Sequence, residues 1–239
     1  VDSVSKLLTW LDSHTAGTLS AFEVMWPEFY EYITREESVH TPPLPHGSAH
    51  YVLVETLGSN PELDAENFEL VLGEAMERGL VSDAVLTRSQ AERNAIWESR
   101  DDVLEFFKLG PFIPFDISVT IENMESFIAE IRAGMKKVEE PICIVFGHLG
   151  DSNLHVLLGT RNADEFDYDA LQTLLYDAVE RYYGSVSAEH GIGLTKREQL
   201  PRSRSETELR LMKGMKRMLD PNNILNPNKI FAAENITAV

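Results

Sequence analysis

The stretch from Ile142 to Gly159 constrains the fold of this chain more than any other segment. It holds two apolar runs, and a short polar segment of Gly, Asp, Ser and Asn residues lies between them. Two apolar runs joined in this way predict an antiparallel hairpin. With the turn centred on residues 151–152, His148 is predicted to lie directly opposite His155.

The rest of the chain alternates between helical and strand patterns. Ser-x-x-Glu capping boxes predict helix starts at Ser20 and Ser205. Helices are predicted twice within residues 3–36 and over residues 64–79, 90–108, 121–137, 168–183 and 205–219. Strands are predicted over residues 50–55, 81–87, 115–119, 142–147, 153–159 and 185–188. This order indicates an α+β fold, in which helices pack on a mostly antiparallel sheet of ferredoxin-like units.

Three parts are expected along the chain. Residues 1–49 are predicted to form a helical N-terminal segment, which a proline-rich stretch separates from the rest. Residues 50–190 are predicted to form the α+β domain that binds substrate. Residues 191–239 are predicted to form a C-terminal helical segment.

Composition excludes several classes of protein. The 239 residues carry a net charge of -18, which opposes binding to nucleic acid or to anionic lipid surfaces. No apolar run approaches the roughly 20 residues of a membrane-spanning helix. Cys143 is the only cysteine, so no disulfide framework exists and a reducing compartment is expected. We expect a soluble protein of the cytoplasm or the mitochondrial matrix, cut from a longer chain.

The two histidines of the hairpin predict a metal site. Directly opposed residues have Cβ atoms about 4.5–5.5 Å apart, close enough for two imidazoles to share one ion. Glu189 and His190 follow the predicted strand 185–188 and precede a Gly-x-Gly turn. Glu189 is the predicted third ligand, and His190 is then free to take a proton. Two histidines and one carboxylate suit zinc, manganese or ferrous iron, with positions left open for substrate.

Each of these histidines, taken alone, is explained as well by a hydrogen-bonded structural role. The joint arrangement favours a metal or acid–base site, and the residues by themselves leave those two kinds of site open.

Three motifs resemble signatures of one family. They are Gly147–His155, Glu189–Gly193 and Leu219–Ile230, and they occur in the family's order. The chain resembles the C-terminal region of FAD-linked oxidases of the vanillyl-alcohol-oxidase type. That region occurs in D-lactate dehydrogenases, D-2-hydroxyglutarate dehydrogenases and the flavin subunit of glycolate oxidase. The resemblance covers essentially the whole chain.

The resemblance implies roles for the residues in these motifs. His148, His155 and Glu189 match the family's metal ligands, and His190 matches its proton-abstracting histidine. Asn226, in the Asn-Pro-x-Lys signature, matches a residue near the reactive edge of the flavin.

Substrate binding is implied at further positions. Arg100 matches an arginine that pairs with a substrate carboxylate, as a planar two-pronged donor does well. Asn153 and the two metal-binding histidines are expected to contact the substrate as well. Pro114 stands where members that oxidise dicarboxylates often carry a basic residue, so the sequence does not favour a hydroxyglutarate-type substrate.

The implied reaction is oxidation of a D-2-hydroxy acid to a 2-oxo acid. The implied cofactors are FAD and a divalent metal, zinc first, with manganese and iron as alternatives. FAD would be bound mainly by an N-terminal flavin domain that this chain lacks, and to which residues 191–239 would return. The partners are the 2-hydroxy acid, that flavin domain and an electron acceptor that the sequence does not identify, with a homodimer as an open alternative.

Two other functions use the same residues. One is a non-catalytic metal-binding module, and the other is a metal-dependent hydrolase that works without flavin. The Asn226-Pro227 signature favours the dehydrogenase, because a hydrolase has no use for a residue at a flavin edge.

Overall fold

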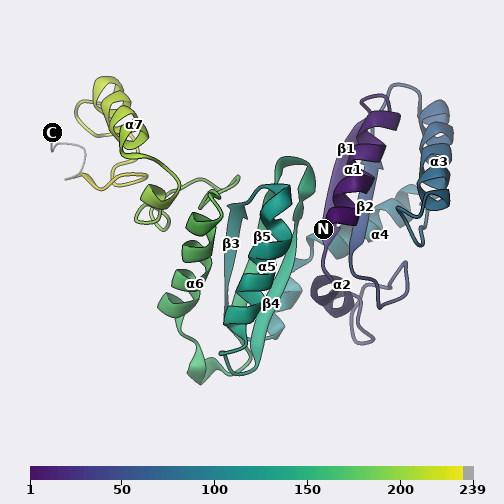
Figure 1. Ribbon diagram of the computed structural model, residues 1–239, viewed down its shortest axis with the longest axis horizontal. Coiled ribbons are helices and arrows are strands. Elements are labelled where there is room, and N and C mark those ends of the chain that lie inside the picture. Colours follow the sequence, from purple (N-terminus) through teal and green to yellow (C-terminus); the bar gives the residue numbers. More distant parts are fainter. Residues whose placement is uncertain (234–239) are drawn as a thin grey trace.

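The computed structural model describes residues 1–233. Its helices and strands, in chain order, are α1 Asp2–His14, β1 Leu19–Met25, α2 Pro27–Ile33, β2 Tyr51–Thr56, α3 Pro61–Glu77, α4 Gln90–Asp101, η1 Val103–Lys108, β3 Phe112–Ser118, α5 Ile121–Met135, β4 Pro141–His148, η2 Leu149–Asp151, β5 Asn153–Thr160, η3 Ala163–Glu165, α6 Tyr168–Arg181, η4 Leu200–Arg202 and α7 Glu206–Leu219. The five strands form one sheet in the order β2-β1-β4-β5-β3, and every adjacent pair is antiparallel (Figure 1). The predicted α+β class and the antiparallel sheet are confirmed.

The sheet is buried on both faces by separate hydrophobic clusters. On one face, α1, α5 and α6 pack against side chains such as Val24, Val145 and Val156. On the other face, α2 and η1 pack against side chains such as Ile144 and Phe146. Because a strand covered on both faces is apolar throughout, its sequence lacks the alternation that marks a half-exposed strand.

This double burial explains one wrong prediction. Residues 20–36 were predicted to begin a helix at Ser20, but Leu19–Met25 is strand β1, between β2 and β4. Its last four residues are all buried, and one of them is Glu23, so the run lacks the alternation of a half-exposed strand and its Ser-x-x-Glu spacing is a coincidence. Residues 1–49 therefore contain a strand as well as helices. The division of the chain into three parts stays a prediction.

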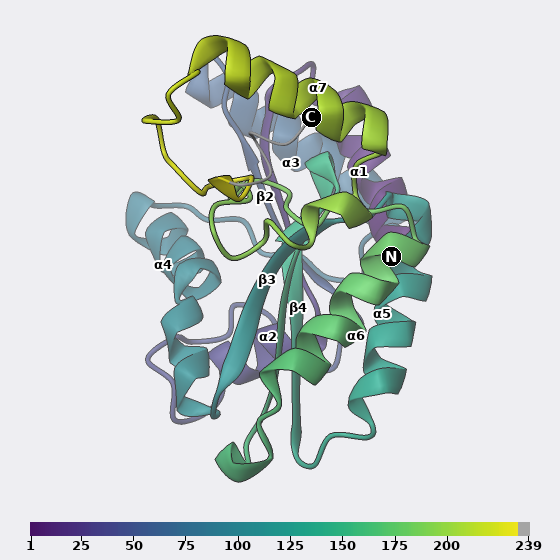
Figure 2. The same ribbon diagram turned by 90° about the vertical axis from the view of Figure 1, so that its left-hand side faces the viewer.

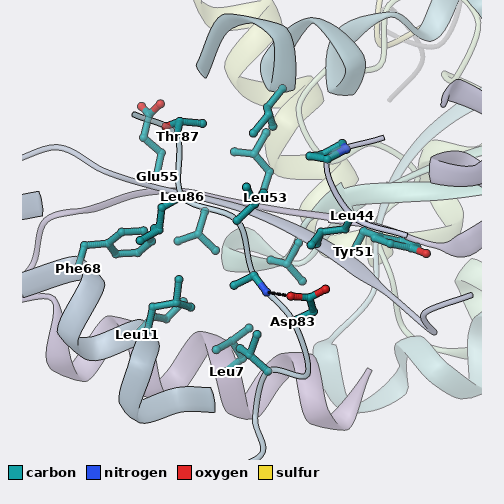
Figure 3. Close-up of a pocket in the computed structure, with 18 of the residues that line it drawn as sticks. Leu7, Leu11, Leu44, Tyr51, Leu53, Glu55, Phe68, Asp83, Leu86 and Thr87 are labelled. Carbon is teal, nitrogen blue, oxygen red and sulfur yellow. Dashed lines mark hydrogen bonds between the residues drawn. The ribbon is translucent and has the colours of Figure 1, made fainter. Parts of the chain in front are cut away.

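Two further strand predictions differ from the structure. Residues 81–87 form no strand, although they line a cavity of about 1010 Å³ together with β2, α1 and α3 (Figure 3). The backbone N–H of Ala84 donates to the carboxylate of Asp83, and that of Arg88, just after this stretch, donates to Glu92. In residues 185–188 only Ser185 forms a bridge, with Ser118 of β3.

Helix α7 begins where the sequence predicts a capped helix start. At the start of α7, Ser205 accepts from the backbone of Glu208, and the Glu208 side chain accepts from Ser205 in return. Helix α7 ends at Leu219, one residue before Asp220 and Pro221, and none of its residues is buried. Residues 234–239, the end of the predicted segment 191–239, lie outside the described residues. Among residues 1–233, no helix combines the length and apolarity needed to cross a membrane.

Candidate metal and acid–base site

Polar side chains from four strands gather on one face of the sheet. Glu23 of β1 is paired with His148 of β4, and Asp116 of β3 is paired with His155 of β5. Phe146 is paired with His155 and lies two residues before His148, so all four polar side chains point to the same face. The loop after α6 crosses the ends of these strands and supplies Glu189 and His190 (Figure 2).

The predicted pairing of the two histidines is wrong by two residues. His155 faces Phe146 rather than His148, because the short helix η2 places the turn one residue earlier than expected. Ser152, directly after η2, takes the left-handed conformation with φ 65°. A shift of two residues keeps each side chain on its face, so the histidines become diagonal neighbours and their Nε2 atoms still lie 3.4 Å apart.

Glu23 orients the His148 ring. Its Oε1 lies 2.7 Å from Nδ1 of His148, and a carboxylate can only accept, so Nδ1 carries the proton. The hydrogen bond raises the pKa of His148, against the opposing effect of burial. In the neutral ring, Nε2 then keeps its lone pair and points it at His155 and Glu189.

Burial sets the charge of His155. Desolvation lowers the pKa of His155 to about 4, and the nearby charges of His148 and Arg100 act in the same direction. At neutral pH the ring is therefore neutral, which is the form that binds a metal.

Glu189 completes a group of three converging atoms. Its Oε1 lies 3.8 Å from Nε2 of His148 and 3.5 Å from Nε2 of His155. His190 Nε2 lies 3.7 Å from the same oxygen, and the His190 side chain is 62% exposed. Gly191, with φ 74°, turns the chain directly after Glu189 and His190, where the sequence predicts a Gly-x-Gly turn. The turn allows both side chains to reach one site.

Asp116 holds the loop that carries Glu189 and His190. It is 2% exposed, and its carboxylate accepts from the backbone N–H groups of residues 188–190 and from the Ser187 hydroxyl. Lys196 Nζ lies 3.2 Å from Oδ2 of Asp116. Burial acts to raise the pKa of Asp116, but the backbone hydrogen bond from His190 and the charge of Lys196 outweigh it and lower the pKa to about 2.

The three converging atoms fit a metal ion. Ligands about 2.1 Å from a tetrahedral zinc lie about 3.4 Å from one another. The distances of 3.4, 3.5 and 3.8 Å between the two Nε2 atoms and Glu189 Oε1 are close to that edge. A looser grouping within 4.8 Å joins His155, Glu189 and His190 with Asp116 instead of His148. We favour the set with His148, because the Asp116 carboxylate already accepts at least five hydrogen bonds.

Arg100 lies beside the cluster but already has a partner. Its Nε and Nη2 donate to Glu23 Oε2 at 3.0 and 2.7 Å, and the residue is 5% exposed. Nη1 is the guanidinium nitrogen that does not donate to Glu23, and it lies 3.7 Å from Asp101.

Asn153 and Asn226 differ in their placement. Asn153 lies two residues before His155 on the same face of β5 and is 1% exposed. Its side-chain Oδ1 and Nδ2 are buried and have no hydrogen-bond partner within residues 1–233. Asn226 lies outside the cluster, in the exposed loop after α7, with φ 49°.

Three residues of the site were missed from the sequence. Glu23 and Asp116 are acidic residues inside apolar strands, which is the signal that could have found them, since a buried carboxylate needs a partner. Lys196 follows the Gly-x-Gly turn without a local pattern that marks it, and it is the counter-ion of Asp116.

The family is decided by a comparison with known protein families. The model of FAD linked oxidases, C-terminal domain, matches residues 1–230. This chain belongs to that family. Members of the family therefore provide the closest guide to what the cluster on the sheet does.

Relatives of known name agree with this assignment. The chain is 35% identical to a D-2-hydroxyglutarate dehydrogenase of Xanthomonas citri pv. viticola, over 89% of this chain and 46% of that protein. It is 32% identical to the mitochondrial D-2-hydroxyglutarate dehydrogenase of Bos taurus, over 89% of this chain and 39% of that one. It is also 32% identical to a D-2-hydroxyglutarate–pyruvate transhydrogenase of Saccharomyces cerevisiae, over 95% of this chain and 48% of that protein. The chain spans less than half the length of each of these relatives.

Solved structures share the fold of this FAD-linked oxidase domain. p-Cresol methylhydroxylase with substrate bound matches with a TM-score of 0.69 at 16% identity, over 98% of this chain and 51% of that one. The 4-ethylphenol oxidase of Gulosibacter chungangensis matches with a TM-score of 0.57 at 16% identity, over 90% of this chain and 48% of that one. These matches concern the fold alone.

Proposed function

We propose that this chain is the substrate- and metal-binding part of an FAD-dependent dehydrogenase that oxidises a D-2-hydroxy acid to a 2-oxo acid. The observation that carries the proposal is the convergence of His148, His155 and Glu189, whose ligand atoms lie 3.4 to 3.8 Å apart in a domain of the FAD-linked oxidase family. The names of the relatives support a D-2-hydroxy acid as the class of substrate.

The proposed metal ligands are His148, His155 and Glu189. A divalent ion, zinc first and manganese or iron as alternatives, supplies Lewis-acid polarisation of the substrate's oxygen atoms when it is bound. Glu23 holds the proton of His148 on Nδ1 and so keeps Nε2 free for this role. The orphaned amide of Asn153 supports a polar ligand beside His155, since a buried amide without partners is costly.

His190 is the proposed catalytic base. Its Nε2 faces Glu189 and would accept the proton of the 2-hydroxyl group. FAD, when bound, would supply the acceptor for the hydride that the α-carbon loses. The His190 side chain is 62% exposed, and its ring nitrogens lie no closer than 3.7 Å to the carboxylates of Glu189 and Asp116, so the imidazole is available to substrate. Arg100 would meet the substrate carboxylate through Nη1, the nitrogen that does not donate to Glu23.

The main proposed partner is a flavin-binding domain of the same protein. The family is that of FAD-linked oxidases, and the relatives are more than twice as long as this chain. The C-terminal segment exposes an unusual number of large apolar side chains, which are Leu211, Met215, Met218, Leu219, Ile224 and Leu225. We infer that this surface packs on the flavin domain and brings Asn226 to the flavin's reactive edge.

The names of the relatives support proposals for the electron acceptor and the compartment. The yeast relative is named for transfer to pyruvate, which makes a 2-oxo acid one candidate acceptor beside a protein acceptor. The cytoplasm or the mitochondrial matrix is the proposed compartment, since the bovine relative carries the name mitochondrial. A homodimer remains an alternative to the monomer.

Flavin reduction in the full-length protein tests the dehydrogenase proposal. With zinc present, a D-2-hydroxy acid should bleach the flavin absorbance, and the L enantiomer should not. His190→Gln should bleach at least 100-fold more slowly, within the range of general-base effects. If no acid of a broad D-2-hydroxy panel bleaches the flavin, the proposal is wrong.

The metal assignment has a separate test that needs no turnover. Purified protein should contain about one equivalent of divalent metal by element analysis, and His148→Ala and His155→Ala should each lose it. His46→Ala is the matched control, because His46 bonds to Thr34 far along the chain from the cluster. Equal metal content in all four proteins would remove the metal from the proposal.

A further inference from the structure

Asp116 is a buried carboxylate that belongs to the sheet but binds only to a loop. It lies in β3 among apolar neighbours, opposite His155, with 2% of its surface exposed. An ionised carboxylate in such a place must be paired and hydrogen-bonded to be tolerated. The side chains beside it on the sheet face do not meet that need, because within residues 1–233 the donors to its two carboxylate oxygens come from residues 187–196.

The loop binds Asp116 at four consecutive residues. The Ser187 hydroxyl donates to Oδ2 at 2.9 Å, and the backbone N–H groups of Ala188, Glu189 and His190 donate at 3.2, 3.3 and 3.0 Å. Ser185, two residues before this stretch, forms an isolated bridge to Ser118, and residues 187–190 themselves belong to no strand. The carboxylate therefore replaces the sheet as the partner of their backbone.

Lys196 closes the arrangement from the other side of the loop. Its Nζ donates to Oδ2 and to the main-chain oxygen of Asp116 at 3.2 and 3.0 Å, and to the Ser187 hydroxyl at 3.0 Å. The Lys196 side chain is 14% exposed. Lys196, at the end of the loop, thus binds both Ser187 at its start and Asp116 in strand β3.

We propose that Asp116, with Lys196 as its counter-ion, is the positioning residue that sets the Glu189 carboxylate opposite His148 and His155. The inference rests on the proposed function, since it concerns the third ligand of the proposed metal site. Asp116 is not itself a ligand, because its oxygens are filled by donors of the loop and an ion would have to compete with all of them.

Two variants separate the contribution of the Asp116 carboxylate from that of the Lys196 cation. Asp116→Asn keeps the size of the side chain but replaces one acceptor oxygen by a donor, which faces N–H groups and the Lys196 ammonium. Lys196→Met removes only the cation and leaves the backbone donors in place. Asp177→Asn is the matched control, because Asp177 also pairs with a cation, Arg202, at 2.7 Å but lies on α6 and does not contact the loop 187–190.

The test measures metal binding in the full-length protein with two readouts. Zinc affinity is measured by competition with a chromophoric chelator, and the coordination of Co²⁺ is read from its visible absorption spectrum. Asp116→Asn should bind zinc 10–100-fold more weakly, as expected when an outer-shell partner is lost, and Lys196→Met should show a smaller loss. The Co²⁺ spectrum of Asp116→Asn should approach that of Glu189→Ala, whereas Asp177→Asn should match the unsubstituted protein.

Each outcome has one interpretation. If Asp116→Asn binds zinc with unchanged affinity and gives the unsubstituted Co²⁺ spectrum, the positioning role is wrong while the metal site stands. If the unsubstituted protein binds neither ion, the proposed function fails first. If Asp116→Asn does not fold, Ser187→Ala and Lys196→Met decide, since each removes only part of the contacts of Asp116 and keeps the carboxylate. Unchanged Co²⁺ spectra in both would overturn the inference.

Discussion

Glu23 is the residue whose replacement tests most of the site at once. Its two oxygens serve different partners, since Oε2 accepts from Nε and Nη2 of Arg100 and Oε1 accepts from Nδ1 of His148. Glu23 and Arg100 are each 5% exposed. In Glu23→Gln, an amide has one acceptor and one donor end, so whichever way it turns, one partner faces a donor.

The expected loss of stability follows from the buried Arg100. Removing one member of a buried ion pair costs about 3–5 kcal/mol, because the other charge is left without compensation. For a protein of this size each kcal/mol lowers the melting temperature by roughly 2–4 °C, so a fall of about 6–20 °C is expected. Loss of the group that orients a ligating histidine should also weaken zinc binding by about 10–100-fold.

A second variant isolates the cause. In Glu23→Gln with Arg100→Met, the uncompensated cation is gone and the amide can turn its oxygen to His148. This double variant should be more stable than Glu23→Gln alone, with a coupling energy of about 0.5–3 kcal/mol between the two sites. Thermal unfolding is followed by circular dichroism in EDTA, so that metal binding does not contribute, and zinc affinity is measured separately.

Glu55 provides the control. It pairs with Arg93 from an edge strand of the same sheet, where the two side chains are 23% and 44% exposed. Glu55→Gln should cost no more than about 1 kcal/mol, as exposed pairs do. Two results would refute the reasoning about the buried pair. One is a Glu23→Gln loss as small as that of Glu55→Gln. The other is a double variant whose loss of stability equals the sum of the losses in Glu23→Gln and in Arg100→Met.

Three further outcomes are expected, on Asp116, Cys143 and Gly147. Asp116, whose pKa hydrogen bonds and Lys196 lower to about 2 against the effect of burial, should contribute roughly 2 kcal/mol that is present above about pH 4 and lost as the pH falls toward 2. Urea unfolding between pH 2 and 6 should show this slope in the unsubstituted protein and not in Asp116→Asn, and equal slopes would contradict it. Burial raises the pKa of Cys143 to about 11, so iodoacetamide at pH 8 should label the native thiol far more slowly than the unfolded one; equal labelling rates would show that the thiol is accessible. Gly147→Ala would press a Cβ onto the main-chain oxygen of Asn153 and should cost about 1–3 kcal/mol in urea unfolding, while Gly150→Ala, with open space around it, should be neutral; equal effects would rule out this close approach.

The sequence by itself determined the elements whose signals are local. The hairpin around residues 142–160, helix α5, helix α6 and the capped start of α7 lie where periodicity and capping predict them. His148, His155, Glu189 and His190 could be selected for the same reason, since their types and spacing within short motifs suffice to suggest a metal and a base. The side chains of these four residues lie close together in the structure, as the sequence predicts, and their roles stay a proposal.

Only the tertiary structure decided which residues support that cluster. Strand pairing joins segments far apart in the chain, so no local pattern tells that β1 lies beside β4 or that Glu23 meets Arg100 and His148. The same limit hid the partner of Asp116, whose donors begin 71 residues further along the chain. The predicted hairpin register was wrong for a different reason. The short helix η2 has no clear sequence signal, and it shifts the pairing of β4 with β5 by two residues. The two-residue period of a strand kept both histidines on one face and within reach of Glu189, as the sequence predicts, while the sheet decided how their side chains are held.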